Sequence, residues 1–164
     1  IMASGTVQAF AAAATVLDAT AEKVFTLGDA AGAGSAMKAV NQLLAGVHIA
    51  AMAEALTFGL SQGVSAEKFV EVIPECAGTS WMLENRAPHI VTGDYTPHSS
   101  VNIWPKDLGI VLDIARGAGF EAPVTEAALA QFVEAAAMGL GGEDDAAVAK
   151  VYAARAGVAL PKND

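Results

Sequence analysis

Three polar side chains suited to acid–base chemistry stand close together in the sequence: Lys38, Asn41 and Gln42. On a helix, residues three and four positions beyond a lysine lie beside it, so the two amides would flank the ammonium group. A lysine set against amides, near the positive end of a helix dipole, can give and take protons at a carbonyl or alcohol oxygen. A solvated lysine on an exposed first turn would show the same spacing, so the residues alone leave both interpretations open.

The same lysine also fits a second reaction class. Ser35 and Lys38 match the Ser-x-x-Lys pattern of acyl-transfer enzymes, in which the lysine activates a serine nucleophile, and residues 100–102 match the companion Ser-x-Asn pattern. The chain contains no Lys-Thr/Ser-Gly motif, and a four-residue pattern recurs by chance. Acyl transfer through Ser35 and Lys38 therefore remains the alternative chemistry.

A glycine-rich turn, with Gly28, Gly32 and Gly34, precedes these residues. A G-x-G-x-x-G dinucleotide loop starting at Gly32 would need glycine where Met37 stands, and a phosphate-binding Walker loop would need an adjacent Gly-Lys-Ser/Thr. Both phosphate-binding patterns fail. The glycines are consistent with a tight connection from a strand to a helix.

The elements that must position these residues differ along the chain. In residues 1–29 a short apolar run, an amphipathic helix and a strand at 23–27 predict one βαβ step. Two strands do not form a stable sheet alone. Because the chain also begins in what reads as the middle of a strand, we expect a fragment of a longer protein.

From residue 30 onward the pattern is helical. Ser35 is predicted to cap a long helix that ends near Ser61, and further helices are predicted at 66–73, 79–86, 105–116, 123–138 and 144–156, with a loop at 87–102. The packed stripe of the long helix is predicted at helical spacing: Val40, Leu44, Val47, Ala51, Ala55 and Phe58. The predicted fold class is mainly all-α, with an N-terminal βαβ remnant.

Charge restricts the partners of this chain. Its 9 Lys and Arg against 18 Asp and Glu give a formal net charge of −9, which disfavours phosphate backbones and anionic lipid. We expect no nucleic acid and no membrane partner; residues 43–60, although apolar, carry His48 and Glu54 and are predicted to be a buried helix. The single cysteine, Cys76, fits a reducing, cytoplasmic location and is predicted to be a small apolar residue.

No metal site is predicted. His89 and His98 lack ligand-spaced Cys, Asp or Glu, and the acidic residues 143–145 are expected to begin a helix. His48 lies about 15 Å along the helix from Lys38, too far to share a reacting atom, and is expected to be a packed histidine.

Several segments in combination resemble the β-hydroxyacid dehydrogenase family, which includes 3-hydroxyisobutyrate, tartronate semialdehyde and 6-phosphogluconate dehydrogenases. The resemblance is carried by Gly32-Ala-Gly34-Ser-Ala-Met-Lys38-Ala-Val-Asn41-Gln42, by Glu54-Ala-Leu and by Lys106-Asp107-Leu108-Gly109. Residues 80–86 and 93–98 look closest to the L-threonate dehydrogenase branch. The resemblance covers essentially the whole chain.

The resemblance implies roles for five residues. Lys38 falls on the family's catalytic lysine, the general base when the hydroxyl of a small 2- or 3-hydroxy acid is oxidised with NAD or NADP. Asn41 and Gln42 would orient the substrate, although the family's amide four residues beyond the lysine is usually Asn. Lys106 falls on the lysine that reaches the nicotinamide cofactor, and Asp107 would help to position it.

The resemblance also implies partners. Residues 1–29 match the end of the family's Rossmann cofactor domain, and 30–164 match its helical substrate-binding and oligomerisation domain. The glycine loop and the Ser-Gly-Gly substrate motif of the preceding domain are missing from this chain. We therefore expect a homodimer or homotetramer of the whole protein, with a non-catalytic oligomerisation and substrate-closure module as the alternative for this fragment alone.

Overall fold

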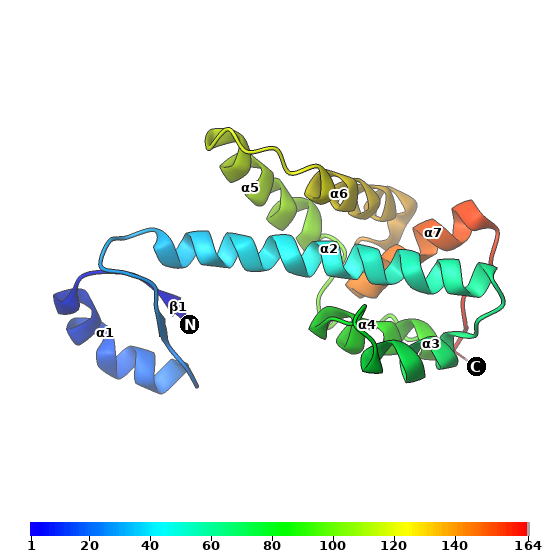
Figure 1. The fold of residues 1–164 in the computed structure, drawn as a ribbon, viewed down its shortest axis with the longest axis horizontal. Coiled ribbons are helices and arrows are strands. Elements are labelled where there is room, and N and C mark those ends of the chain that lie inside the picture. The colour runs from blue at the N-terminus through cyan, green and yellow to red at the C-terminus, as the bar shows by residue number, and fades with distance from the viewer. Residues whose placement is uncertain (164) are drawn as a thin grey trace. The chain divides into compact units, whose positions relative to one another are not determined.

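The computed structural model describes residues 1–163, and these form two compact units, residues 1–42 and the residues from 43 onward. The long helix α2 (Ala33–Ser61) contributes its first turns to one unit and its remainder to the other. The chain is predominantly helical with one small sheet, as the sequence predicts (Figure 1).

The first unit contains a parallel βαβ step. Strand β1 (Met2–Ala3) pairs with β2 (Phe25–Thr26), and helix α1 (Val7–Thr20) connects them. The side chain of Thr6 caps α1 by accepting a hydrogen bond of 3.2 Å from the Ala9 amide. The predicted βαβ step is confirmed, and none of the residues of α1 is buried within this chain.

The glycine-rich turn connects β2 to α2 and allows a close backbone approach. Gly28 and Gly32 have φ values of 120° and 109°, which side chains rarely tolerate. A Cβ atom on Gly34 would lie 2.6 Å from the carbonyl oxygen of Met2. The Gly34 amide donates a 3.1 Å hydrogen bond to Ser4 Oγ. The glycines thus form the tight strand-to-helix connection that the sequence allowed.

The start of α2 differs from the prediction. The helix begins at Ala33, so Ser35 lies inside its first turn and is not its cap. The hydroxyl of Ser4 accepts from an amide of that first turn, so a residue distant in sequence supplies this bond.

The packed side of α2 differs from the predicted stripe, of which Val47 packs against the core. Val40, Leu44 and Phe58 are 53%, 48% and 65% exposed. The buried positions lie on the other side and include several small residues: Gly46, Ile49, Ala50, Met52, Ala53, Leu56 and Thr57. The small side chains on this side let neighbouring helices approach α2 closely, while Ile49, Met52 and Leu56 fill the space between the helices.

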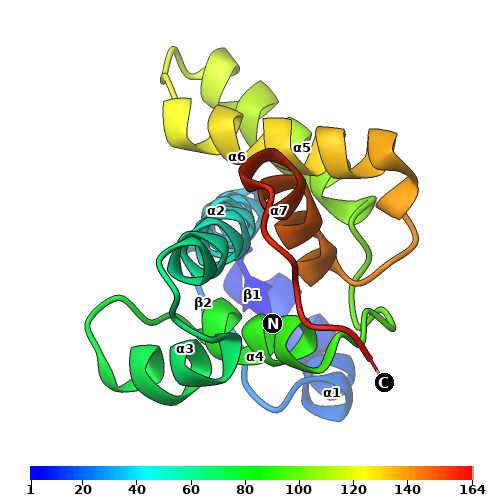
Figure 2. The same cartoon turned by 90° about the vertical axis from the view of Figure 1, so that its right-hand side faces the viewer.

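Helices lie on two sides of α2, with α3 and α4 below it and α5, α6 and α7 above it in the view of Figure 1, an arrangement that Figure 2 confirms end-on. Their bounds are α3 (Ala66–Val72), α4 (Trp81–Thr92), α5 (Ile103–Gly117), α6 (Pro123–Ala135) and α7 (Ala149–Ala156). Short 3₁₀ turns occupy Ile73–Glu75 and Asp145–Val148, and a π turn occupies Ala136–Leu140. The predicted helix at 123–138 is shorter as an α-helix, because it ends at Ala135 and continues as the π turn. The predicted helix at 144–156 is also shorter, because it begins with the second 3₁₀ turn.

Helix α4 corrects the predicted loop at 87–102. It continues through Pro88 to Thr92, although proline removes a backbone donor. Its buried residues are Leu83, Arg86, Ala87 and Ile90, which form one helical face. Burial of this face outweighs the local cost of Pro88. The prediction failed because the prolines and Gly93 were taken as loop signals, whereas the helix continues through Pro88 and ends at Gly93.

Cys76, predicted to be a small apolar residue, follows the 3₁₀ turn at Ile73–Glu75 and is exposed. Among the described residues, α2 is the helix long and apolar enough to cross a membrane by length and composition, and 39% of its most apolar window is buried in the fold.

Candidate active site

The side chains of Lys38, Asn41 and Gln42 meet at a single oxygen atom. Lys38 Nζ donates a hydrogen bond of 2.5 Å to Gln42 Oε1, and Asn41 Nδ2 donates one of 2.9 Å to the same oxygen. All three residues lie in the first turns of α2, within the first unit. Lys38 and Asn41 are exposed and Gln42 is half-buried, so a small molecule can reach the cluster.

This arrangement suits proton transfer at an oxygen atom. The 3.6-residue helical period places Gln42 one turn beyond Lys38, and its amide oxygen holds the lysine nitrogen at a defined point. Because an amide is neutral, it orients the lysine without supplying a compensating negative charge. The nitrogen can therefore act as base when deprotonated and as acid when protonated.

The acyl-transfer alternative receives no support from the geometry. Within the described residues, Ser35 makes no hydrogen bond to Lys38, whose ammonium group is directed to Gln42. Ser100 lies in the second unit and pairs through its backbone with Asp144 in an antiparallel bridge. Neither serine is arranged as a nucleophile next to a base.

Lys106 and Asp107, predicted to face the cofactor, lie in the first turns of α5 in the second unit. Lys106 Nζ is 3.1 Å from Asp107 Oδ1, and their side chains are 68% and 17% exposed. An exposed ammonium group near the positive end of a helix dipole fits an anionic or polar ligand group. The part of the chain that the structure describes thus keeps Lys106 accessible.

A buried ion pair that the sequence did not predict is bonded to Trp104, in the first turn of α5. Arg86 Nε donates to Asp145 Oδ1 at 2.6 Å, and Trp104 Nε1 donates to Asp145 Oδ2 at 2.9 Å. Asp145 is fully buried and Arg86 is 7% exposed. Burial raises the pKa of the Asp145 carboxyl above its usual range, while the bond from Trp104 and the charge of Arg86 act in the opposite direction.

The neighbouring carboxylate is buried as well. Asp144 Oδ2 accepts from the His98 amide at 2.9 Å, and Oδ1 accepts from the Ala146 amide at 3.0 Å. The prediction that the acidic run begins a helix is correct, but these carboxylates are interior acceptors and not solvated charges. A basic residue at the spacing of an apolar face, as Arg86 is on α4, was the available signal for a buried acidic partner.

The two aromatic residues of this region have opposite surroundings. Trp104 is 3% exposed and stacks on Phe132 with ring centroids 5.5 Å apart. Trp81, at the start of α4, is 70% exposed. Trp104 is thus a core residue two positions before Lys106.

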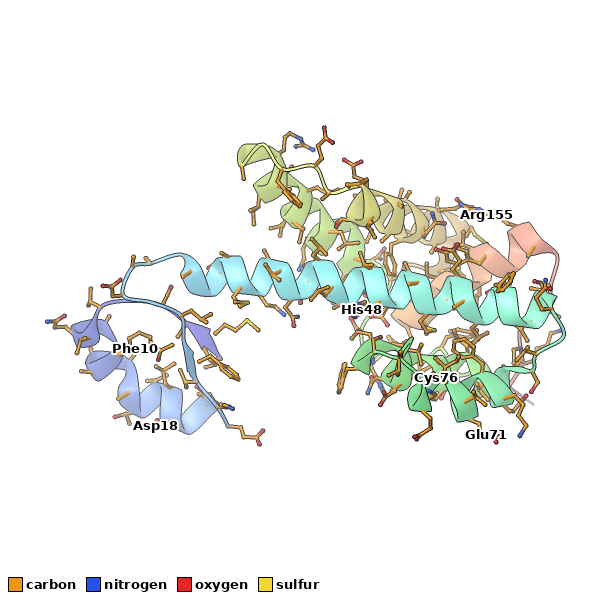
Figure 3. The ribbon with its side chains drawn as sticks, viewed as in Figure 1. Phe10, Asp18, His48, Glu71, Cys76 and Arg155 are labelled. Atoms are coloured by element: carbon orange, nitrogen blue, oxygen red, sulfur yellow. The ribbon has the colours of Figure 1, made fainter. Side chains whose placement is uncertain are left out.

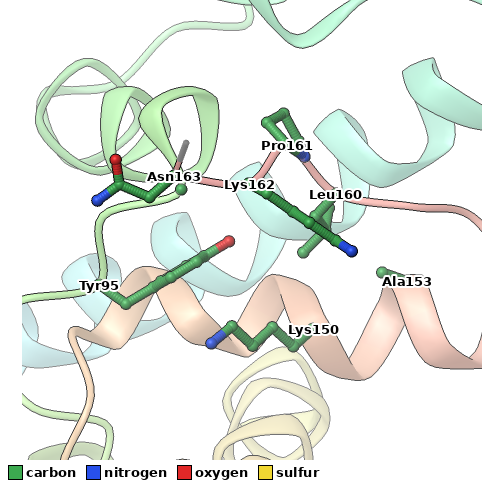
Figure 4. A pocket seen from close by; sticks show the side chains of 8 residues that line it. Tyr95, Lys150, Ala153, Leu160, Pro161, Lys162 and Asn163 are labelled. Carbon is green, nitrogen blue, oxygen red and sulfur yellow. The ribbon is translucent and has the colours of Figure 1, made fainter.

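Two cavities in the second unit are lined by residues other than the predicted site residues. One of about 390 Å³ has Tyr95 and Lys150 on one side and residues 160–163 on the other (Figure 4). The other, about 350 Å³, is mainly apolar and is lined by His48, which Figure 3 labels on α2, together with residues of α3 and α4. His48 is half-buried there.

His89 and His98 lie edge to face, with ring centroids 4.8 Å apart. His89 Nδ1 is 3.0 Å from the carbonyl oxygen of Asp94. No group of three His, Cys, Asp or Glu side chains that could hold a metal ion occurs among the residues described.

Comparison with known proteins adds independent findings. A family model described as NAD-binding of NADP-dependent 3-hydroxyisobutyrate dehydrogenase matches residues 32–152. The L-threonate dehydrogenase of Cupriavidus necator is 53% identical over 161 residues, which are 98% of this chain and 53% of that protein. The chain spans about half the length of the curated relatives it matches.

Solved structures show the same fold. The 3-hydroxyisobutyrate dehydrogenase of Salmonella typhimurium is 48% identical and has a TM-score of 0.87, covering 92% of this chain and 53% of that one. The 3-hydroxyisobutyrate dehydrogenase of Mycobacterium tuberculosis, in a structure with L-serine, is 29% identical and has a TM-score of 0.82 over the same shares.

Proposed function

This chain belongs to the family of NAD-binding domains of NADP-dependent 3-hydroxyisobutyrate dehydrogenase, and from that membership we propose that the whole protein oxidises the hydroxyl of a small 2- or 3-hydroxy acid with NAD or NADP. The observation that carries the proposal is the convergence of Lys38 and Asn41 on the amide oxygen of Gln42. It supplies the proton-transfer group that the oxidation of an alcohol requires.

In this proposal Lys38 is the general base. Its neutral amine accepts the proton of the substrate hydroxyl while the carbon–hydrogen bond gives up a hydride, and the same residue returns a proton in the reverse reaction. The nicotinamide cofactor, when bound, supplies the hydride acceptor. Gln42 Oε1, which accepts from Lys38 Nζ at 2.5 Å, keeps the nitrogen in place between turnovers.

Asn41 and Gln42 would orient the substrate. Each amide nitrogen can donate to a hydroxyl or carboxylate oxygen, and these are the polar groups of a small hydroxy acid. L-threonate is the first substrate to test, because a relative named L-threonate dehydrogenase is 53% identical over nearly the whole chain.

Lys106 and Asp107 would face the cofactor. An ammonium group that is 68% exposed at a helix start fits the polar and anionic groups of a dinucleotide. Residues 32–37 do not complete a G-x-G-x-x-G loop, so we propose that the remainder of the longer protein supplies the main dinucleotide site.

The test compares Lys38→Ala with Ser35→Ala in the full-length protein, with NAD⁺ and NADP⁺ and a panel of hydroxy acids that includes L-threonate. We expect Lys38→Ala to lower kcat by about 10²- to 10⁴-fold, the usual contribution of a general base. Ser35→Ala should retain hydride transfer. If loss of Ser35 abolishes turnover and loss of Lys38 does not, the proposal is wrong and acyl transfer regains support.

A further inference from the structure

The segment that leads into α5 has no cap of its own. Asn102, the residue before the helix, makes no side-chain capping bond. The backbone amides of Val101 and Asn102 instead donate to the carbonyl oxygens of Glu143 and Gly141, at 3.0 and 3.1 Å. The location of this helix start is therefore decided by residues that follow it by about forty positions in the sequence.

Trp104, in the first turn of α5, is held from three directions. Its indole N–H donates to Asp145, and its ring stacks on Phe132. On the third side α2 passes so closely that a Cβ atom on Gly46 would lie 2.9 Å from Trp104 Cε3. The ring has no room to rotate, so the backbone of this turn follows the position of Asp145.

Asp145 is in turn held by Arg86 of α4, whose Nε lies 2.6 Å from Oδ1. Asp145 therefore bridges two helices, accepting one bond from each. A buried ion pair is often no more stable than an apolar replacement of the same volume, because both charges lose their hydration. Unlike apolar contacts, an ion pair makes directional hydrogen bonds, and here these bonds fix the position of Asp145 between α4 and α5.

Lys106 itself is exposed, but it lies between two buried residues of α5, Trp104 and Leu108. Its side chain is 68% exposed and forms an ion pair with Asp107, the next residue on the same helix. Both buried residues are two positions from Lys106, and Trp104 is the one whose side chain makes a directional bond to another segment, at Asp145.

We propose that Asp145 is a positioning residue for Lys106: through its bond to the Trp104 indole it holds the first turn of α5 where the Lys106 ammonium meets the cofactor. This inference rests on the proposed function. Arg86 and Asp145 do not touch the cofactor; they act on it through Trp104 and Lys106.

The test is a double-mutant cycle in the full-length protein between Trp104→Phe and Lys106→Ala. Phenylalanine keeps an aromatic ring against Phe132 and removes the N–H donor together with part of the indole ring, so a melting-temperature measurement accompanies the binding assay. We expect Trp104→Phe to raise the Kd and KM for NAD⁺ or NADP⁺ roughly tenfold, since a displaced binding group loses most of its contact. In the Lys106→Ala background the same change should have almost no further effect.

Trp81→Phe is the matched control, because Trp81 is 70% exposed and lies outside the proposed site. It should leave the cofactor Kd and the KM for the hydroxy acid unchanged. Asp145→Asn offers a second disruption, because the amide cannot accept from both Arg86 and Trp104 in the same way. It should reproduce the rise in cofactor Kd at temperatures well below its melting temperature.

The outcomes separate the two proposals. If the wild-type protein binds neither NAD⁺ nor NADP⁺ by calorimetry, the proposed function fails and this inference with it. If the wild type binds and turns over, but the effects of Trp104→Phe and Lys106→Ala simply add, Asp145 has a structural role only and this inference alone is overturned. A lower melting temperature with unchanged cofactor Kd would also overturn it.

Discussion

Gly46 offers a sharp test of how α2 packs in the second unit. A Cβ atom at this position would lie 2.8 Å from Leu108 Cδ2 and 2.9 Å from Trp104 Cε3. Leu108 is fully buried, and Trp104 is bonded to Asp145, so neither neighbour can move away at low cost. Gly46→Ala should therefore force α2 and α5 apart.

The expected magnitude combines two opposing terms. Overpacking a well-packed core costs about 1–3 kcal/mol, and the constrained neighbours place this site in the upper part of that range. Alanine gains about 1 kcal/mol over glycine in a helix interior. We expect a net loss of roughly 1–2 kcal/mol in the free energy of unfolding, which lowers the melting temperature by about 2–8 °C.

The same helix provides the control. A Cβ atom on Gly59 would meet only Val64 Cβ, at an ordinary contact distance of 3.7 Å. Gly59→Ala should therefore stabilise the protein by roughly 0.5–1 kcal/mol. Urea unfolding followed by circular dichroism measures both variants. If Gly46→Ala proves as stable as Gly59→Ala, the close crossing of α2 and α5 is not present in solution.

Three further predictions follow from the fold and the site. Burial raises the pKa of Tyr95 to about 12, so the folded protein keeps a proton that the unfolded chain releases above pH 10, and stability falls as pH rises from 10 to 12. Because the Tyr95 hydroxyl is buried without a hydrogen-bond partner among the described residues, Tyr95→Phe should match or exceed the wild type at neutral pH and show less of that alkaline loss in urea unfolding. Gly93→Ala should lower the melting temperature more than Gly119→Ala, as thermal unfolding would measure. Both glycines have φ near 66°, but only at Gly93 would a Cβ atom meet another segment, 2.6 Å from the Lys162 carbonyl carbon. Finally, calorimetry should detect no NAD⁺ or NADP⁺ binding to the 164-residue chain alone but clear binding to the full-length protein; tight binding to the short chain would contradict the two-domain proposal.

Local geometry explains which parts of the site could be predicted. Lys38, Asn41 and Gln42 lie within one and a half turns of a helix, so their spacing alone brings them together, and the structure shows them sharing one oxygen. The family resemblance, read from ordered motifs along the whole chain, is confirmed by the family match over residues 32–152. The roles of Lys38, Lys106 and their neighbours stay predictions until the variants are measured.

Contacts between distant residues explain what could not be predicted. Arg86 and Asp145 are 59 positions apart, and nothing local to either indicates the other. The predicted helix ended at Arg86 because Pro88 and the residues after it were taken as a loop, and the burial of Arg86 and Ile90 on one face is not visible locally. Burial of Arg86 against Asp145 therefore belongs to the tertiary contacts that the sequence does not show.

The sequence by itself determined the mainly helical fold, the βαβ step and the grouping of Lys38 with two amides, because each depends on residues within a few turns of one another. Only the tertiary structure decided which side of α2 is packed. The spacing of apolar residues allowed more than one side, and the structure buries the side with Ile49, Met52 and Leu56, where α5 approaches closely at Gly46. Helical periodicity gives the spacing of a face, but the shape of the neighbouring helices decides which face is buried.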